Sequence, residues 1–245
     1  MPDFIKEIKH VHDTGAFKYA DGILSNGKYK VGKFVKQGCE RFMNDLKRDD
    51  IYLDLEVARK VVNYPRLLKH WKGAKAGTPI ILEPHQEFYF QQMFGWKRTD
   101  TELRRFTRSF KEIGRKNGKT TELAITGVYH THVDLPSGPA FFVGATKEDQ
   151  ARITLLDAAN ILPNEWITDG TFKIYKTGKY PREILIPKNQ GSMATVGRDS
   201  KRSDGLDVSL AGIDEYHEHP DTSIRDILAS AQGNRIEPLE SIITT

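Results

Sequence analysis

The chain has 245 residues, of which 38% are hydrophobic and 29% charged, and its formal net charge is +4. This is ordinary globular composition, sufficient for one large domain or two modest ones. Its apolar runs, such as 140–143, are far shorter than the roughly 18 residues of a membrane-spanning helix, and the Met1 end does not resemble a signal peptide, so we expect no membrane association. The single cysteine, Cys39, excludes an internal disulfide, while the charge neither requires nor excludes a nucleic-acid partner.

The first part of the chain, residues 1–96, is predicted to be a mainly helical subdomain. Pro65 and the stretch 73–79 interrupt its helical pattern. Apolar side chains at helical spacing lie on common faces of the expected helices: Val31, Phe34, Val35, Cys39, Phe42, Met43, and later Val57, Val61, Val62, Leu67 and Leu68.

Residues 97–245 change to short β-prone runs that alternate with helical ones, which is typical of an α/β sheet. Between 171 and 197 several short strands follow one another, which predicts an inserted β meander. The other segments of this pattern are 108–113, 120–132, 140–146, 147–161, 208–213 and 241–245. We therefore predict a doubly wound, mainly parallel sheet, with the helical subdomain before it and ligands at the C-terminal edge of its strands.

The segment Gly114–Thr121 lies between a β-prone and a helix-compatible run, which predicts a phosphate-binding loop. Gly118 would let backbone amides approach the phosphates, Lys119 would reach the β and γ oxygens, and the Thr120 hydroxyl would ligate magnesium. The general pattern has its first glycine where this chain has Ile113, and a basic surface turn is the alternative interpretation. The predicted ATP-binding residues of the loop are Gly114, Arg115, Lys116, Asn117, Gly118, Lys119, Thr120 and Thr121.

The buried strand predicted at 208–213 ends in two carboxylates, Asp214 and Glu215. In a phosphate-loop ATPase, Asp214 would hold magnesium and Glu215 would orient and deprotonate the attacking water, which favours hydrolysis over transfer to a metabolite. A solvated junction between strand and loop is the alternative. The next residues, 216–219, contain two histidines at a spacing unlike that of a helical zinc site, so we expect a polar loop near the nucleotide.

Together these segments resemble the large terminase subunits of tailed bacteriophages, of the HK97-like kind, from about Ala16 to Thr245. The loop of that family commonly has Arg-Lys-Asn-Gly-Lys-Ser/Thr without the early glycine, as 115–120 does, and its acidic pair precedes Tyr-His, as in 213–217. Further agreement lies at 84–88, 94–96, 145–151 and 203–206. The resemblance implies a P-loop NTPase fold of the ASCE type and an ATPase motor that uses ATP and magnesium to package double-stranded DNA into a procapsid.

The resemblance also implies roles for two polar residues. Gln86 resembles the glutamine that contacts adenine, for which a surface or capping glutamine is the alternative. Arg115 resembles a loop arginine proposed to act in cis on the γ-phosphate, for which a solvated charge is the alternative.

Two further roles are implied near the C-terminal strands. A catalytic arginine supplied in trans by a neighbouring subunit is expected before the acidic strand, and we assign it to Arg202, with Arg198 as the other candidate. The segment 241–245 resembles the motif that couples hydrolysis to DNA movement, which makes Thr244 and Thr245 the predicted coupling residues.

The partners implied by the resemblance are double-stranded DNA, the portal protein, the terminase small subunit and further copies of the chain in a ring, although an isolated domain is expected to be monomeric. The expected location is the host cytoplasm, at the procapsid portal. Large terminases continue into a nuclease domain of the ribonuclease H type, and this chain stops at the coupling motif, so we expect ATP hydrolysis without DNA cleavage. A helicase-like nucleic-acid-dependent ATPase and a non-catalytic DNA- or nucleotide-binding module are the alternatives.

Overall fold

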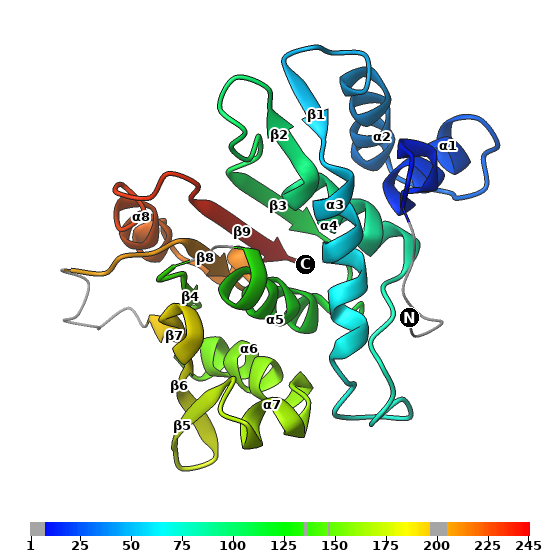
Figure 1. The fold of residues 1–245 in the computed structure, drawn as a ribbon. Coiled ribbons are helices and arrows are strands. Elements are labelled where there is room, and N and C mark those ends of the chain that lie inside the picture. Colours follow the sequence, from blue (N-terminus) through cyan, green and yellow to red (C-terminus); the bar gives the residue numbers. More distant parts are fainter. Residues whose placement is uncertain (1–7, 135–136, 147, 197–204) are drawn as a thin grey trace. The chain divides into compact units, whose positions relative to one another are not determined.

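The structure is a computed structural model that describes residues 8–134, 137–146, 148–196 and 205–245. It contains two compact units, each considered by itself (Figure 1). The helical unit comprises the chain up to Leu67 together with Pro79–Phe106, and the sheet unit comprises Leu68–Thr78 together with Thr107–Thr245. Within the described ranges, no helix is long and apolar enough to cross a membrane.

The helical unit is mainly helical, with one two-stranded antiparallel sheet formed by β1 and β2. Two of its helices are capped at the N-terminus by side chains. The Thr14 hydroxyl accepts a hydrogen bond from the backbone N–H of Phe17 in α1, and the Asp54 carboxylate accepts two from backbone N–H groups in the first turn of α3. The elements are η1 (Val11–Asp13), α1 (Gly15–Leu24), α2 (Lys33–Asp45), β1 (Ile51–Leu53), α3 (Leu55–Asn63), η2 (Tyr64–Leu67), α4 (Pro84–Gly95) and β2 (Trp96–Arg98).

The apolar residues at helical spacing along α2 are buried only in the later part of the helix. Phe34 is 84% exposed and Val35 is also exposed, whereas Cys39 and Phe42 are fully buried. The first turn of α2 is not among the residues of the hydrophobic core that α2 forms with α1, and no described residue of the helical unit buries the Phe34 side chain. Leu67, at the end of η2, is also exposed.

The sheet unit contains seven strands in the order β3-β9-β8-β4-β7-β6-β5. The first five of these are parallel to one another, and β6 is antiparallel to both of its neighbours. The elements are β3 (Arg108–Glu112), α5 (Lys119–Tyr129), the π-helical turn η3 (His130–Asp134), β4 (Ala140–Gly144), α6 (Glu148–Ile161), α7 (Asn164–Thr168), β5 (Lys173–Thr177), β6 (Tyr180–Ile186), η4 (Pro187–Asn189), β7 (Gly191–Val196), β8 (Leu210–Ile213), η5 (Tyr216–Glu218), α8 (Ser223–Ser230) and β9 (Leu239–Thr244).

The predicted α/β class, with a mainly parallel sheet and a meander, is confirmed. The meander is the run β5-β6-β7, and it extends one end of the sheet. Its last strand, β7, pairs in parallel with β4, so the meander also supplies a strand of the parallel core.

Helices cover both faces of this sheet, as a doubly wound fold requires (Figure 1). Helix α5 packs on one face, where a Cβ atom at Gly127 would clash with the Phe141 ring and one at Gly212 would lie 2.6 Å from the same ring. On the opposite face, a Cβ at Gly144 would clash with Ile224 of α8. Glycine therefore permits close approach of helix and sheet at these positions.

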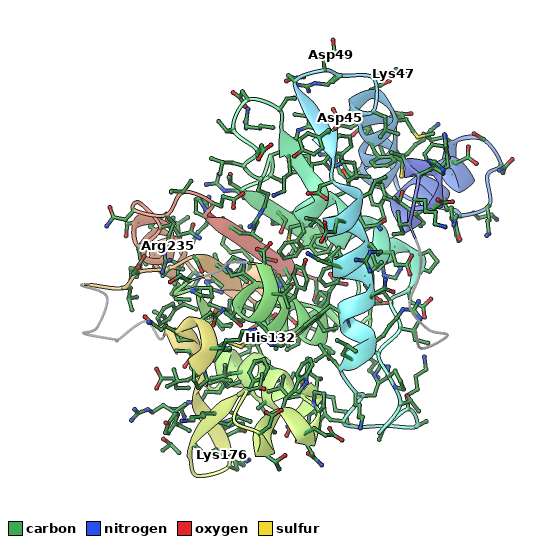
Figure 2. All side chains as sticks on the ribbon, viewed as in Figure 1. Asp45, Lys47, Asp49, His132, Lys176 and Arg235 are labelled. Atoms are coloured by element: carbon green, nitrogen blue, oxygen red, sulfur yellow. The ribbon has the colours of Figure 1, made fainter. Side chains whose placement is uncertain are left out.

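At the edge of the sheet where the parallel strands begin, an arginine forms hydrogen bonds that link several strand starts. Arg235, labelled in Figure 2, lies between α8 and β9. Its guanidinium donates hydrogen bonds to the Asp207 carboxylate at 2.6 Å and to the Gly138 carbonyl oxygen at 2.7 Å. These bonds join the segments that precede β9, β8 and β4, and they hold the starts of these three strands together.

Candidate functional site

The candidate site lies at the opposite edge, where parallel strands end. Because β3, β9, β8 and β4 are parallel neighbours, the residues that follow them meet at this edge. The predicted phosphate loop follows β3, Thr245 follows β9, and Asp214 and Glu215 follow β8. The strand order thus gathers three predicted segments that lie far apart in the sequence.

The predicted phosphate loop has two residues in the left-handed backbone region. They are Lys116, with φ of 65°, and Gly118, with φ of 75°, which is the N-cap residue of α5. A Cβ at Gly118 would meet no atom within 4 Å, so glycine is required there by the backbone angle and not by space. The Asn117 side chain closes the loop by donating hydrogen bonds to the carbonyl oxygens of Gly114 (2.9 Å) and Arg115 (3.3 Å). A loop of this kind at a helix N-terminus presents backbone amides to an anion.

Lys119 is 7% exposed, and its ammonium group is held inside the sheet edge. Its Nζ donates hydrogen bonds to the carbonyl oxygen of Ile113 at 3.1 Å and to the Thr245 hydroxyl at 2.5 Å. The Thr245 hydroxyl in turn donates to Oε2 of Glu215 at 3.0 Å. A continuous hydrogen-bond chain therefore joins the loop lysine to the second residue of the acidic pair.

Asp214 is almost fully buried, with 2% of its surface exposed. Its Oδ2 accepts a hydrogen bond from Thr154 of α6 at 3.2 Å, while its buried Oδ1 has no hydrogen-bond partner among the described residues. Burial raises the pKa of this carboxyl to about 6, and the neighbouring charge of Glu215 contributes to the increase.

The unsatisfied oxygen of Asp214 fits a hard divalent cation. Magnesium prefers oxygen ligands and commonly takes only one or two protein carboxylates, with water and phosphate oxygens completing its shell. A buried carboxylate oxygen without a partner provides one such ligand, and the Thr120 hydroxyl at the start of α5 forms no hydrogen bond within the described residues. No group of three or more His, Cys, Asp or Glu side chains in the described part of the chain forms a metal cluster of its own.

Glu215 adopts a left-handed conformation, with φ of 47° and ψ of 53°, which is uncommon for a residue other than glycine. The turn that follows it is attached to β9. The backbone N–H of His217 donates to the Thr244 hydroxyl at 3.1 Å, and the His217 Nδ1 lies 2.9 Å from the same oxygen and 3.5 Å from Oε2 of Glu215. His219 Nε2 donates to the backbone carbonyl of Asp214 at 3.1 Å. The two histidines therefore hold the acidic turn against its own strand and against β9.

The structure brings most of the predicted catalytic and coupling residues together. Lys119, Thr245 and Glu215 are directly connected, and Thr244 reaches the same turn through His217.

Other predicted residues have different surroundings. The side chains of Arg115 and Lys116 are exposed and form no ion pair or hydrogen bond within the described ranges. The Thr121 hydroxyl donates to Asp157 of α6 at 2.7 Å, so it is directed toward that helix. Gln86 belongs to the helical unit, where its side-chain oxygen accepts a hydrogen bond from the backbone of Glu83 in the capping box of α4. The predicted trans arginines, Arg202 and Arg198, lie outside the described residues.

Sequence reasoning missed two residues of α6, Thr154 and Asp157. Both are buried, Thr154 contacts Asp214, and Asp157 contacts Thr121. Their signal in the sequence is weak: two polar residues three apart lie on one face of a helix whose neighbouring positions, Ala151 and Ala158, are buried and apolar.

The fold and this sheet edge define a P-loop nucleoside triphosphatase, with a glycine-containing loop after β3 and an acidic pair after β8. Residues 84–245 match the family described as the terminase large subunit, ATPase domain. The match covers more than half of the chain, and the chain belongs to this family. The resemblance noted in the sequence is therefore confirmed, and family membership implies nucleotide binding and ATP hydrolysis.

Solved structures of phage terminases are similar to this chain. The crystal structure of the HK97 bacteriophage large terminase superposes with a TM-score of 0.63 at 21% identity, over 77% of this chain and 37% of that one. The Thermus phage P74-26 large terminase ATPase domain gives 0.46 at 16% identity (56% and 59% of the two chains), and a large terminase from a thermophilic bacteriophage gives 0.44 at 9% (57% and 34%). The chain thus spans little more than a third of the HK97 protein, and this likeness supports the fold. No curated protein matches the chain.

Proposed function

We propose that this chain is the ATPase motor of a phage large terminase, which hydrolyses ATP with magnesium to package double-stranded DNA into a procapsid. The observation that carries the proposal is the hydrogen-bond chain from Lys119 through Thr245 to Glu215. It joins the loop that would bind phosphate, the strand that would respond to hydrolysis and the carboxylate that would activate water.

The loop and the first turn of α5 would bind the triphosphate. The backbone amides of 114–118 and the ammonium of Lys119 would hold the β and γ oxygens, and a phosphate oxygen would replace the Thr245 hydroxyl at Nζ because charged acceptors form stronger hydrogen bonds. Thr120 and Asp214 are the residues that would hold magnesium. The ion supplies neutralisation of the charge that develops on the phosphate oxygens.

Glu215 would act as the general base. Its Oε2 already accepts one hydrogen bond from Thr245 and lies near His217, so its carboxylate is oriented before water arrives. We assign Arg115, which is exposed on the loop, to charge neutralisation in cis, and Arg202 or Arg198 to the same task in a neighbouring subunit. We assign the Gln86 side-chain amide to contact with the adenine base of ATP.

The partners we propose are double-stranded DNA, the portal protein, the terminase small subunit and further copies of the chain in a ring, all in the host cytoplasm. DNA contact should be with phosphates and largely independent of base sequence. No observation favours a helicase-like ATPase or a non-catalytic module. We propose that the residues described here serve ATP hydrolysis and not DNA cleavage.

ATP turnover tests the proposal. The chain, assembled with portal and linear double-stranded DNA and supplied with magnesium and ATP, should release phosphate. Glu215→Gln should abolish this release while ATP still binds, and Lys119→Ala should weaken binding as well. Matched controls are Glu165→Gln on α7 and Lys179→Ala before β6, both exposed, which should leave turnover unchanged. Phosphate release by Glu215→Gln at the native rate would refute the assignment.

A further inference from the structure

Asp157 of α6 gathers hydrogen-bond donors from two separate segments of the sheet unit. Its side chain is buried, with 1% of the residue exposed. One carboxylate oxygen, Oδ2, accepts from the Thr121 hydroxyl at 2.7 Å, and the other, Oδ1, accepts from the indole Nε1 of Trp71 at 3.0 Å and from Nζ of Lys72 at 3.3 Å. A carboxylate so far from water depends on such donors, because burying a charge without partners costs considerable free energy.

The first of these segments is the start of the P-loop helix. Thr121 lies in the first turn of α5, two residues after Lys119 and next to Thr120. Its hydroxyl donates a hydrogen bond to Asp157, and this bond attaches the first turn of α5 to α6. Any displacement of the turn toward a bound phosphate therefore acts on this hydrogen bond.

The second segment, Leu68–Thr78, is called the arm here. The arm belongs to the sheet unit, although the chain on each side of it, up to Leu67 and from Pro79, belongs to the helical unit. It folds back on itself through hydrogen bonds between its residues 70 and 78 (2.9 Å) and 77 and 70 (2.6 Å). The backbone N–H of Lys69 donates to the carbonyl oxygen of Ile161 at the end of α6, at 2.9 Å. The arm is thus anchored on α6 and carries a covalent connection to the helical unit at each end.

Helix α6 also contacts the acidic pair from the same face. Thr154 is three residues before Asp157, which places both on one side of the helix, and its hydroxyl donates to Asp214. One helix face therefore touches the residue proposed to hold magnesium, the first turn of the P-loop helix and, through Asp157, the arm.

We infer that Asp157 is a positioning residue that couples occupancy of the phosphate loop to the arm. Binding of a nucleotide phosphate draws the first turn of α5 toward the ligand, and Thr121 moves with it. The Asp157 carboxylate either moves with the Thr121 hydroxyl or loses its hydrogen bond to it. Both responses change the hydrogen bond that Asp157 accepts from Trp71. The inference rests on the proposed nucleotide site and adds a route by which that site acts on the segment that links the two units.

Trp71 provides a direct readout, because its indole forms one of the bonds and the residue is partly exposed. Tryptophan emission of the native chain would be titrated with Mg-ADP and with Mg-AMP-PNP, while calorimetry measures binding of the same nucleotides. The expected result is an emission change that saturates with the calorimetric Kd and is absent from Trp71→Phe. The chain has three tryptophans, so the Trp71→Phe variant assigns the signal to one of them.

Variants at Thr121 and Asp157 separate coupling from simple stabilisation. Thr121→Val removes the donor at nearly constant volume, and it should eliminate the Trp71 signal at nucleotide concentrations where calorimetry shows the variant to be saturated; Thr121→Ser should restore the signal. Asp157→Asn places an NH₂ group against one set of donors, so it should break the same bridge. Lys72→Met, which leaves the Thr121 and Trp71 bonds in place, is the matched control and should keep the signal.

Two results would overturn the inference. If nucleotide binds to the native chain but Trp71 emission does not change, or if Thr121→Val only lowers the melting temperature and keeps the signal, Asp157 has a structural role and the proposed nucleotide site still stands. If calorimetry detects no nucleotide binding to the native chain, the proposed function and the inference fail together.

Discussion

Nζ of Lys119 lies 2.5 Å from Oγ1 of Thr245, although 126 residues separate them in the sequence. The strand order explains the contact, because β9 lies between β3, which precedes the phosphate loop, and β8, which precedes Glu215. The last residue of the described chain therefore stands between the loop lysine and the proposed general base. A ligand that replaces the Thr245 hydroxyl as hydrogen-bond acceptor of Lys119 therefore also changes the surroundings of Glu215.

The first prediction concerns this threonine. Thr245→Val keeps the shape of the side chain and removes both hydrogen bonds, so Glu215 loses an orienting donor. A hydrogen bond to a charged group is worth about 1.5–3 kcal/mol, and we expect the ATP turnover number to fall about ten- to a hundredfold with little change in nucleotide Kd. Steady-state phosphate release and calorimetry measure the two effects. Thr245→Ser should retain near-native turnover. Equal ATP turnover by Thr245→Val and the native chain would show that the contact has no catalytic role.

The second prediction concerns the pH dependence of stability without magnesium. The pKa of Asp214 is about 6 in the fold, against an ordinary value of 3.8. The folded state therefore holds more protons than the unfolded state between these pH values, so the free energy of unfolding falls as pH rises from about 4 to about 6. A pKa difference of this size corresponds to at most about 3 kcal/mol. Urea denaturation at a series of pH values should show the decrease, and Asp214→Asn should remove this part of it.

Thr154 supplies a check on that assignment. Its hydrogen bond favours the ionised form and lowers the pKa of Asp214. Thr154→Val should therefore move the pH-dependent decrease to higher pH, whereas an unchanged profile would mean that another group titrates there.

The third prediction is that Asp214→Asn is more stable than the native chain when magnesium is absent. At pH 7.5 the native carboxylate is ionised and buried, with one oxygen unsatisfied, and a neutral amide avoids most of that desolvation cost. We expect a higher melting temperature without magnesium, no further increase when Mg-ADP is added, and loss of ATP turnover. A lower melting temperature in the variant would show that the charge of Asp214 stabilises the fold.

Local sequence patterns predicted the parts of the site that consist of adjacent residues. The loop around Gly118 and the pair Asp214–Glu215 depend on neighbouring residue types at the end of a strand, and the family match confirms the class of protein that they indicated. The contact between Lys119 and Thr245 depends on which strands are neighbours, and strand order is not encoded in any short window. The roles of the individual residues remain predictions.

Other features escaped prediction because their cause lies in packing. Phe34 follows the same apolar spacing as Phe42, and only the absence of a partner for the first turn of α2 within the helical unit, as far as the described residues extend, leaves it exposed. The strands β1 and β2 have three residues each, which is too short for an alternating pattern to be seen. Asp157 has the residue type of a solvated helix position, and its burial depends on donors from Thr121 and from the arm.

The last prediction compares two glycines that are required for different reasons. Gly118→Ala places a side chain at a φ of 75°, in open space, so we expect only the backbone strain of about 1–2 kcal/mol. Gly127→Ala keeps a helical backbone but forces a methyl group into the Phe141 ring, so overpacking of the core should cost about 1–3 kcal/mol. Urea denaturation measures both losses, and Phe141→Leu should partly rescue Gly127→Ala but not Gly118→Ala. Rescue of both variants, or of neither, would contradict the separate origins of the two requirements, since only the second glycine faces that ring.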